Sequence, residues 1–190
     1  MRVLQNDPAD HERRSDSTGD PGCGLYEGSV TKINGQAHFS NPNVKKKYKL
    51  LGATPLISTH INKLTEGDFI SIDGNMNEDQ TAININSVNY IGLKSLIGTW
   101  YADTATCFHF LTYTDFTISR RIGNNCVSQQ NVNYTYIINP STLTWVILIS
   151  GERGSYVGDV SFVNTKNVQL DLYDSDSGAI VRQLYLQKKK

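Results

Sequence analysis

The sequence predicts an all-β protein made of two small antiparallel barrels in tandem. From residue 25 onward, apolar and polar residues alternate almost everywhere, which is typical of strands with one buried face. Glycine, asparagine, proline or aspartate bounds each alternating run, as expected of turns. The 190 residues show no convincing helical stripe of apolar positions with caps. Closing such strands into barrels removes the unpaired sheet edges that invite aggregation.

The first set of runs predicts one barrel over residues 24–95. Gly28 would let the first strand coil tightly, and Gly67 with Asp68 would form a turn. The order of these runs resembles the OB-fold, which implies a five-stranded Greek-key barrel. That resemblance leaves function open, because OB-folds bind oligonucleotides, sugars, small ligands and proteins. The predicted strands are Leu25–Ile33, Tyr48–Leu51, Leu56–Ile61, Asp68–Asn75 and Thr81–Ile91.

The second set of runs predicts an up-and-down barrel over residues 96–190. Its first strand carries Gly98-Thr99-Trp100-Tyr101, and this Gly-x-Trp pattern before eight runs resembles the lipocalin-like (calycin) barrels. The resemblance implies that Trp100 packs across one end of the barrel. Some 90 residues are too few for a full lipocalin, so the barrel is either short, with little cavity, or similar in topology alone. The predicted strands are Gly98–Ala102, Cys107–Leu111, Asp115–Arg120, Asn131–Ile138, Leu143–Ser150, Ser155–Val163, Asn167–Asp174 and Ile180–Gln187.

Two connecting segments complete this organisation. Residues 1–23 contain five acidic residues, three arginines and almost no apolar residues, which predicts a disordered leader. That leader is either a mature tether left after removal of a secretory signal or a cytoplasmic N-terminus. The connector at residues 92–96 is too short for a flexible tether, so the two domains should contact each other.

Charge argues against a strongly basic binder of nucleic acid or membranes. Lysine plus arginine and aspartate plus glutamate each number 18. The local exception is a cluster in the loop between the first two predicted strands, where lysines surround Tyr48. This cluster is either a polyanion contact or a solvated, lysine-guarded strand edge. Its members are Lys45, Lys46, Lys47, Tyr48 and Lys49.

The cysteines suggest a covalent cross-link and no metal centre. Cys107 and Cys126 lie 19 residues apart and flank a predicted two-strand unit, so antiparallel pairing could bring them within bridging distance. The alternative is two buried free thiols. The sequence has no Cys-x-x-Cys pair, so we predict no zinc site, and no motif calls for a cofactor.

Catalytic motifs are also lacking in the sequence. It contains neither His-Glu-x-x-His nor Gly-x-Ser-x-Gly. His109 alternates with Phe108 and Phe110, which is typical of a satisfied or exposed strand histidine. We therefore predict no catalytic residues and a protein that is not an enzyme. A site assembled from residues distant in sequence is the alternative.

Aromatic residues gather in the second domain and provide the ligand-binding candidates. These are Trp100, Tyr134, Tyr136 and Trp145, and their pattern fits a filled core and a lined pocket equally. The run Val146–Ile149 is apolar on both faces, so the first domain, a second copy or a partner should cover it.

We therefore expect a binding or adaptor protein of the cell envelope or secreted space that recognises a protein partner or a small apolar ligand. Cytoplasmic location and single-stranded nucleic-acid binding are the alternatives.

Overall fold

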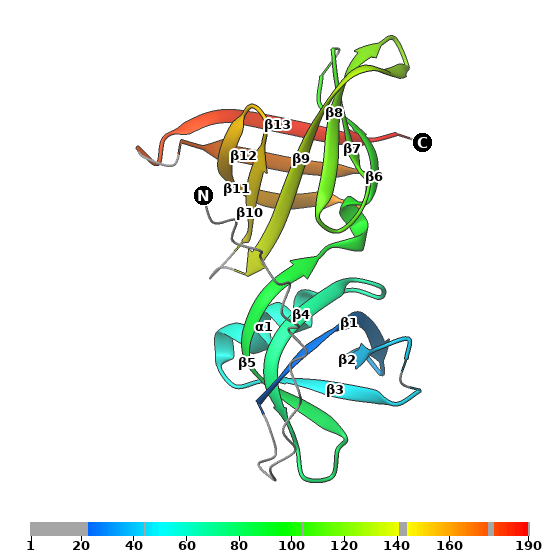
Figure 1. The fold of residues 1–190 in the computed structure, drawn as a ribbon, viewed down its shortest axis with the longest axis vertical. Helices are drawn as coiled ribbons and strands as arrows, with labels where there is room; N and C mark the ends of the chain where they lie inside the picture. Colours follow the sequence, from blue (N-terminus) through cyan, green and yellow to red (C-terminus); the bar gives the residue numbers. More distant parts are fainter. Residues whose placement is uncertain (1–22, 44, 104, 141–143, 175–176, 190) are drawn as a thin grey trace, which may run out of the picture.

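The computed structural model describes residues 23–43, 45–103, 105–140, 144–174 and 177–189, and it confirms the all-β fold class with two barrels in tandem. The barrels lie one above the other along the long axis of the molecule (Figure 1). Apart from Cys23, where the first strand begins, the leader predicted for residues 1–23 lies outside the described residues. Among the described residues, no helix is long and apolar enough to cross a membrane.

The first barrel closes around a long, bent strand, β1. Its first part pairs with β4 and its last part with β2, and the two pairings meet at Ser29. Gly28 permits this change of partner, because a Cβ there would lie 2.6 Å from the backbone oxygen of Ser40. Further pairing runs from β2 to β3, β3 to β5 and β5 to β4, as in the OB-like barrel that the sequence predicts. The elements are β1 (Cys23–Ile33), β2 (Gln36–Ser40), β3 (Lys47–Gly52), α1 (Pro55–Lys63), β4 (Phe69–Met76) and β5 (Ala82–Gly92).

Three features of this barrel differ from the sequence prediction. The segment predicted as strand Leu56–Ile61 is the helix α1, in which Thr54 caps the N-terminus by accepting a hydrogen bond from the Ile57 amide. Pro55 occupies the first turn, where its missing N–H costs nothing. A second strand, β2, follows the Asn34–Gly35 turn, in which both residues have positive φ. The β3–β5 pair is parallel, whereas we expected only antiparallel pairs.

The second barrel is an up-and-down meander in which each strand pairs with the next along the chain. The β13–β6 pairing closes it, and all eight strands match predicted runs to within a few residues except β9, which starts earlier. The strands are β6 (Gly98–Tyr101), β7 (Thr106–Phe110), β8 (Asp115–Ile122), β9 (Asn125–Pro140), β10 (Trp145–Gly151), β11 (Gly154–Asn164), β12 (Asn167–Tyr173) and β13 (Ile180–Lys188).

The two barrels pack directly against each other, as the short connector predicts. The 3₁₀-helix η1 (Lys94–Leu96) joins them, and Ile91 of β5 pairs with Ile138 of β9. Tyr113, in the β7–β8 turn, reaches into the first barrel, where its hydroxyl donates to the carbonyl of Gly67 at 2.7 Å. Its ring stacks on Phe69 with 5.7 Å between centroids.

Candidate functional site

An aromatic stack lines the interior of the second barrel. Phe108, Phe116 and Tyr134 come from three successive strands, and period-two alternation turns each side chain inward. Phe116 stacks on Tyr134 with 5.1 Å between ring centroids and on Phe108 with 5.9 Å. These offset aromatic contacts hold the wall rigidly at low conformational cost.

Next to this wall lies a cavity of about 240 Å³. That volume exceeds the roughly 150 Å³ of an apolar cavity that binds benzene, and it falls short of the roughly 300 Å³ at which drug-sized sites begin. The cavity is mainly apolar, with Tyr134, Tyr156 and Arg182 as the lining residues that carry polar groups. Its lining residues are Phe108, Phe116, Ile118, Tyr134, Ile149, Tyr156, Leu172, Val181, Arg182 and Leu184.

The lining includes one charged side chain, that of Arg182. Its guanidinium lies 3.8 Å from the carboxylate of Asp103, and both side chains are about half exposed. An ion pair this long and this exposed contributes little to stability. Arg182 can therefore exchange Asp103 for another partner at small cost.

Two large aromatic side chains fill another part of the barrel interior. Trp100 is fully buried, and its indole Nε1 donates to the Leu96 carbonyl at 2.7 Å. Tyr136 is also buried, and its hydroxyl donates to the Thr112 carbonyl at 2.9 Å. Burial raises the pKa of the Tyr136 phenol, with a further contribution from the charge of Asp115. The interior is thus packed around Trp100 and Tyr136 and open beside Tyr134, and ligand binding in the open part stays a prediction.

Of the four aromatic ligand-binding candidates, Tyr134 lines the cavity, whereas Trp100 and Tyr136 belong to the packed part. Trp145, the fourth candidate, does not line this cavity and lies at the junction of the barrels instead. Its ring packs against the His60 ring with 5.6 Å between centroids, and Lys63 Nζ lies 5.9 Å from its centroid. The contacts with His60 and Lys63 on α1 hold Trp145 at this position. The sequence did not predict these contacts, because it predicted a strand where α1 lies.

A polar cluster covers the outer face of β6, β7 and β8. Cys107 and Cys126 form a disulfide, so their sulfurs are bonded to each other. The ring nitrogens of His109 contact the hydroxyl oxygens of Thr99 at 3.1 Å and of Ser119 at 2.7 Å. His109 and the two cysteines place possible ligand atoms within 4.8 Å of one another. The disulfide consumes the two thiolates that a zinc site would need.

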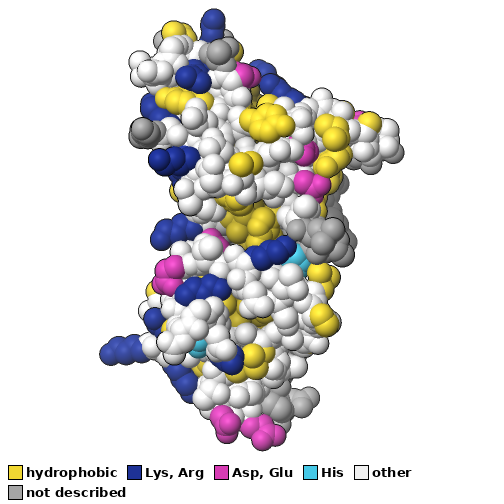
Figure 2. All heavy atoms as spheres, turned by 180° about the vertical axis from the view of Figure 1, so that it is seen from behind, with side chains coloured by type: hydrophobic (Ala, Val, Ile, Leu, Met, Phe, Trp, Pro, Cys, Tyr) yellow, Lys and Arg dark blue, Asp and Glu magenta, His cyan; other side chains and the backbone are white. Residues whose placement is uncertain are grey.

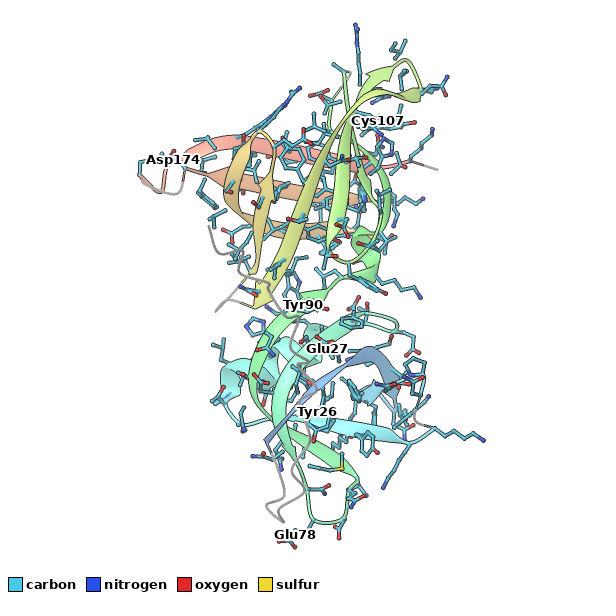
Figure 3. All side chains as sticks on the ribbon, viewed as in Figure 1. Tyr26, Glu27, Glu78, Tyr90, Cys107 and Asp174 are labelled. Carbon is cyan, nitrogen blue, oxygen red and sulfur yellow. A yellow bond between two sulfur atoms is a disulfide. The ribbon has the colours of Figure 1, made fainter. Side chains whose placement is uncertain are left out.

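The lysine cluster lies elsewhere in the first barrel than predicted. Because β2 precedes it, the cluster spans the β2–β3 loop and the start of β3, not the loop between the first two strands. Lys46 Nζ lies 5.6 Å from the centroid of Tyr48. The β4–β5 turn, a loop that OB-folds commonly use for ligands, carries Glu78 and Asp79 instead. Glu78 lies at the end of the first barrel that points away from the second (Figure 3).

Sequence reasoning did not find Arg182, Val181 or Tyr113. Arg182 and Val181 lie at the start of β13, where the strand residues are exposed to solvent. Nothing in the sequence around them distinguishes them from other exposed strand residues, so it does not indicate that they line a cavity.

The chain matches none of the protein-family models, curated proteins or solved structures with which it was compared.

Proposed function

We propose that this chain is a binding protein without catalytic activity that holds a small apolar ligand in the second barrel. The observation that carries the proposal is the 240 Å³ cavity, whose walls are aromatic and aliphatic side chains fixed by the barrel. Pockets of this character, concave and apolar with a few polar groups, are typical of small-molecule sites. The ligand would be intermediate in size between benzene and a drug molecule.

The mouth of the cavity offers a test that spares the core. Val181 lines the cavity and is 54% exposed, so Val181→Trp should obstruct it without disturbing packed residues. Val163 is 65% exposed and lies outside the cavity lining, so Val163→Trp is the matched control. The probe is 2-naphthol, whose fluorescence reports exclusion of water.

We expect 2-naphthol to bind the unaltered protein and Val163→Trp with a Kd between about 10 μM and 1 mM, given the affinity that a ligand of its size can reach. Val181→Trp should weaken binding at least about tenfold. Absence of saturable binding to the unaltered protein, or equal binding by the two variants, would contradict the proposal.

We also propose that the protein works in the cell envelope or secreted space. The support is the Cys107–Cys126 disulfide, because such bonds form and persist in oxidising compartments. Mass spectrometry of protein alkylated before and after reduction, taken from native cells, tests this. Alkylation of Cys107 and Cys126 in the unreduced protein, in addition to Cys23, would oppose it.

Protein recognition is a second candidate, favoured by an exposed apolar row on the second barrel. Ile137, Leu148 and Val157 are cross-strand neighbours on β9, β10 and β11, and all three are exposed. This row is the outer face that the Val146–Ile149 pattern predicted to be covered, and the first barrel leaves it open. Leu148→Lys should raise solubility, and it should abolish any self-association seen by sedimentation.

Nucleic-acid binding is the weaker alternative. The acidic β4–β5 turn would repel phosphates, and the lysine cluster lies on a different loop. We expect no binding of a single-stranded oligonucleotide at low salt. Binding that weakens steeply with salt, and that is lost on replacing Lys45, Lys46 and Lys47 by alanine, would support this alternative.

A further inference from the structure

We propose that the groove between the two barrels is a saccharide-binding site. The groove has a volume of about 590 Å³, which lies within the range of small-molecule sites, and such sites favour domain interfaces. It is separate from the cavity of the second barrel, because the two share no lining residue. Helix α1 and the segment after it form one side, β10 and β11 form the other, and the connector lies between them.

Aromatic and aliphatic side chains form the apolar part of the groove. Trp145 and Phe162 are partly buried, whereas Val160 and Leu93 are almost fully buried. Figure 2 shows hydrophobic side chains at the waist of the molecule, where the barrels meet, with lysine or arginine side chains nearby. A partly exposed indole ring can stack against the apolar C–H face of a sugar ring.

Uncharged hydroxyl and amide groups make up most of the polar part, beside the charged side chains of Lys63 and Asp68. A site lined this way suits a ligand with many hydroxyl groups and no dense charge, since each hydroxyl both donates and accepts hydrogen bonds. An aromatic face beside such groups favours a sugar ring over a purely apolar ligand, because only the sugar adds hydrogen bonds to the polar groups. These neutral polar residues are Thr65, Ser95, Thr144, Ser161, Asn164 and Thr165. The hydroxyls of Thr65 and Thr144 donate to Asp68 and Asp159, and Asn164 Oδ1 accepts from its neighbours, so toward a ligand the two hydroxyls accept and the Asn164 amide donates.

The carboxylate in the lining, Asp68, has a structural role. Its side chain is buried and accepts hydrogen bonds from the amides of Thr65 at 2.6 Å and Lys94 at 2.8 Å. One oxygen therefore accepts from Thr65 in the segment after α1 and the other from Lys94 in the connector, so both oxygens are occupied within the protein. What remains for recognition is the aromatic face, the neutral polar groups and the ammonium of Lys63, whose Nζ lies 5.9 Å from the centroid of the Trp145 ring.

The groove is held open by contacts on both sides of the connector. Tyr113 bridges the barrels through its hydrogen bond to Gly67, and Gly92 packs so closely under the Tyr113 ring that a Cβ there would lie 2.6 Å from it. The Ile91–Ile138 pairing adds backbone continuity. A site between two locked bodies is preorganised, so binding need not order the barrels first.

The chain supplies its own reporter for the test. It has two tryptophans, of which Trp100 is fully buried and Trp145 lines the groove, so a ligand-dependent change in emission reports the groove. The probes are maltotriose and N-acetylchitotriose, and glycerol is the control that has hydroxyls but no ring. We expect a saturable change in emission with at least one trisaccharide at a Kd of roughly 1 mM or tighter, and none with glycerol.

Matched variants locate the site by calorimetric titration. Ser161 and Ser155 are both exposed on β11, but Ser161 lines the groove and Ser155 does not. Ser161→Arg should weaken saccharide binding by about tenfold or more, whereas Ser155→Arg should leave it unchanged. Trp145→Leu should also weaken it, with near-ultraviolet dichroism confirming the fold.

Two results would overturn the proposal. One is no saturable response to either trisaccharide up to about 50 mM, well above the expected Kd. The other is equal binding by Ser161→Arg and Ser155→Arg. Val181→Trp obstructs the other site, so saccharide binding that survives in this variant separates the groove from the barrel cavity.

Discussion

Replacing Trp100 by alanine should strongly destabilise the second barrel. The indole is 0% exposed and packs in the continuous hydrophobic core. Removing a buried tryptophan side chain costs about 3–5 kcal/mol. The variant also strands the carbonyl of Leu96, which now accepts the indole N–H at 2.7 Å in a buried position, and this adds about 1–2 kcal/mol. The expected loss in the free energy of unfolding is therefore about 4–7 kcal/mol.

Urea unfolding followed by far-ultraviolet dichroism measures this loss, and the emission of Trp145 follows the junction at the same time. Trp100→Phe keeps much of the packing but loses the N–H donor, so it should cost about 1–3 kcal/mol. Trp145→Ala, at a partly exposed position, should cost less than Trp100→Ala. A loss below about 1 kcal/mol for Trp100→Ala would refute the view that this ring plugs a packed barrel end.

The remaining predictions concern the junction, the disulfide and acid. Tyr113→Phe removes the hydrogen bond to Gly67 and should cost about 1 kcal/mol, whereas Tyr113→Ala should split one calorimetric transition into two; a single unchanged transition would contradict this. Reduction of the Cys107–Cys126 bond should lower the free energy of unfolding by about 3 kcal/mol in a urea titration, and no change would show that the loop is already constrained. Burial lowers the pKa of His109 below its usual 6.5, and the charge of Lys189 lowers it further. The stabilisation from neutral His109 is therefore present above pH 6.5 and is lost as the pH falls through the folded-state value. His109→Gln should reduce this loss between pH 7 and pH 5, and an unaltered pH profile would exclude His109 as its source.

The alternation of side chains was enough to predict most of the architecture. A strand buries every second residue whatever its partner, so the eight runs after residue 96 and the inward parity of Phe108, Phe116 and Tyr134 follow from local order. The disulfide between Cys107 and Cys126 could be predicted from local order too, because the two cysteines flank a short antiparallel unit of the chain. Helix α1 was missed although Thr54 and Pro55 mark its start, because its few apolar residues also fit a short strand.

The features that bear on function required the tertiary structure. A cavity exists where side chains from many strands fail to fill a volume together, and no one strand carries that information. Trp145 has the inward parity of its strand, but it sits at the barrel end, and contacts with His60 and Lys63 from the other barrel decide its place. The same holds for Tyr113, whose partner Gly67 is 46 residues away. Period-two patterning thus determined which side chains face inward, whereas long-range packing alone decided which of them touch and where space remains.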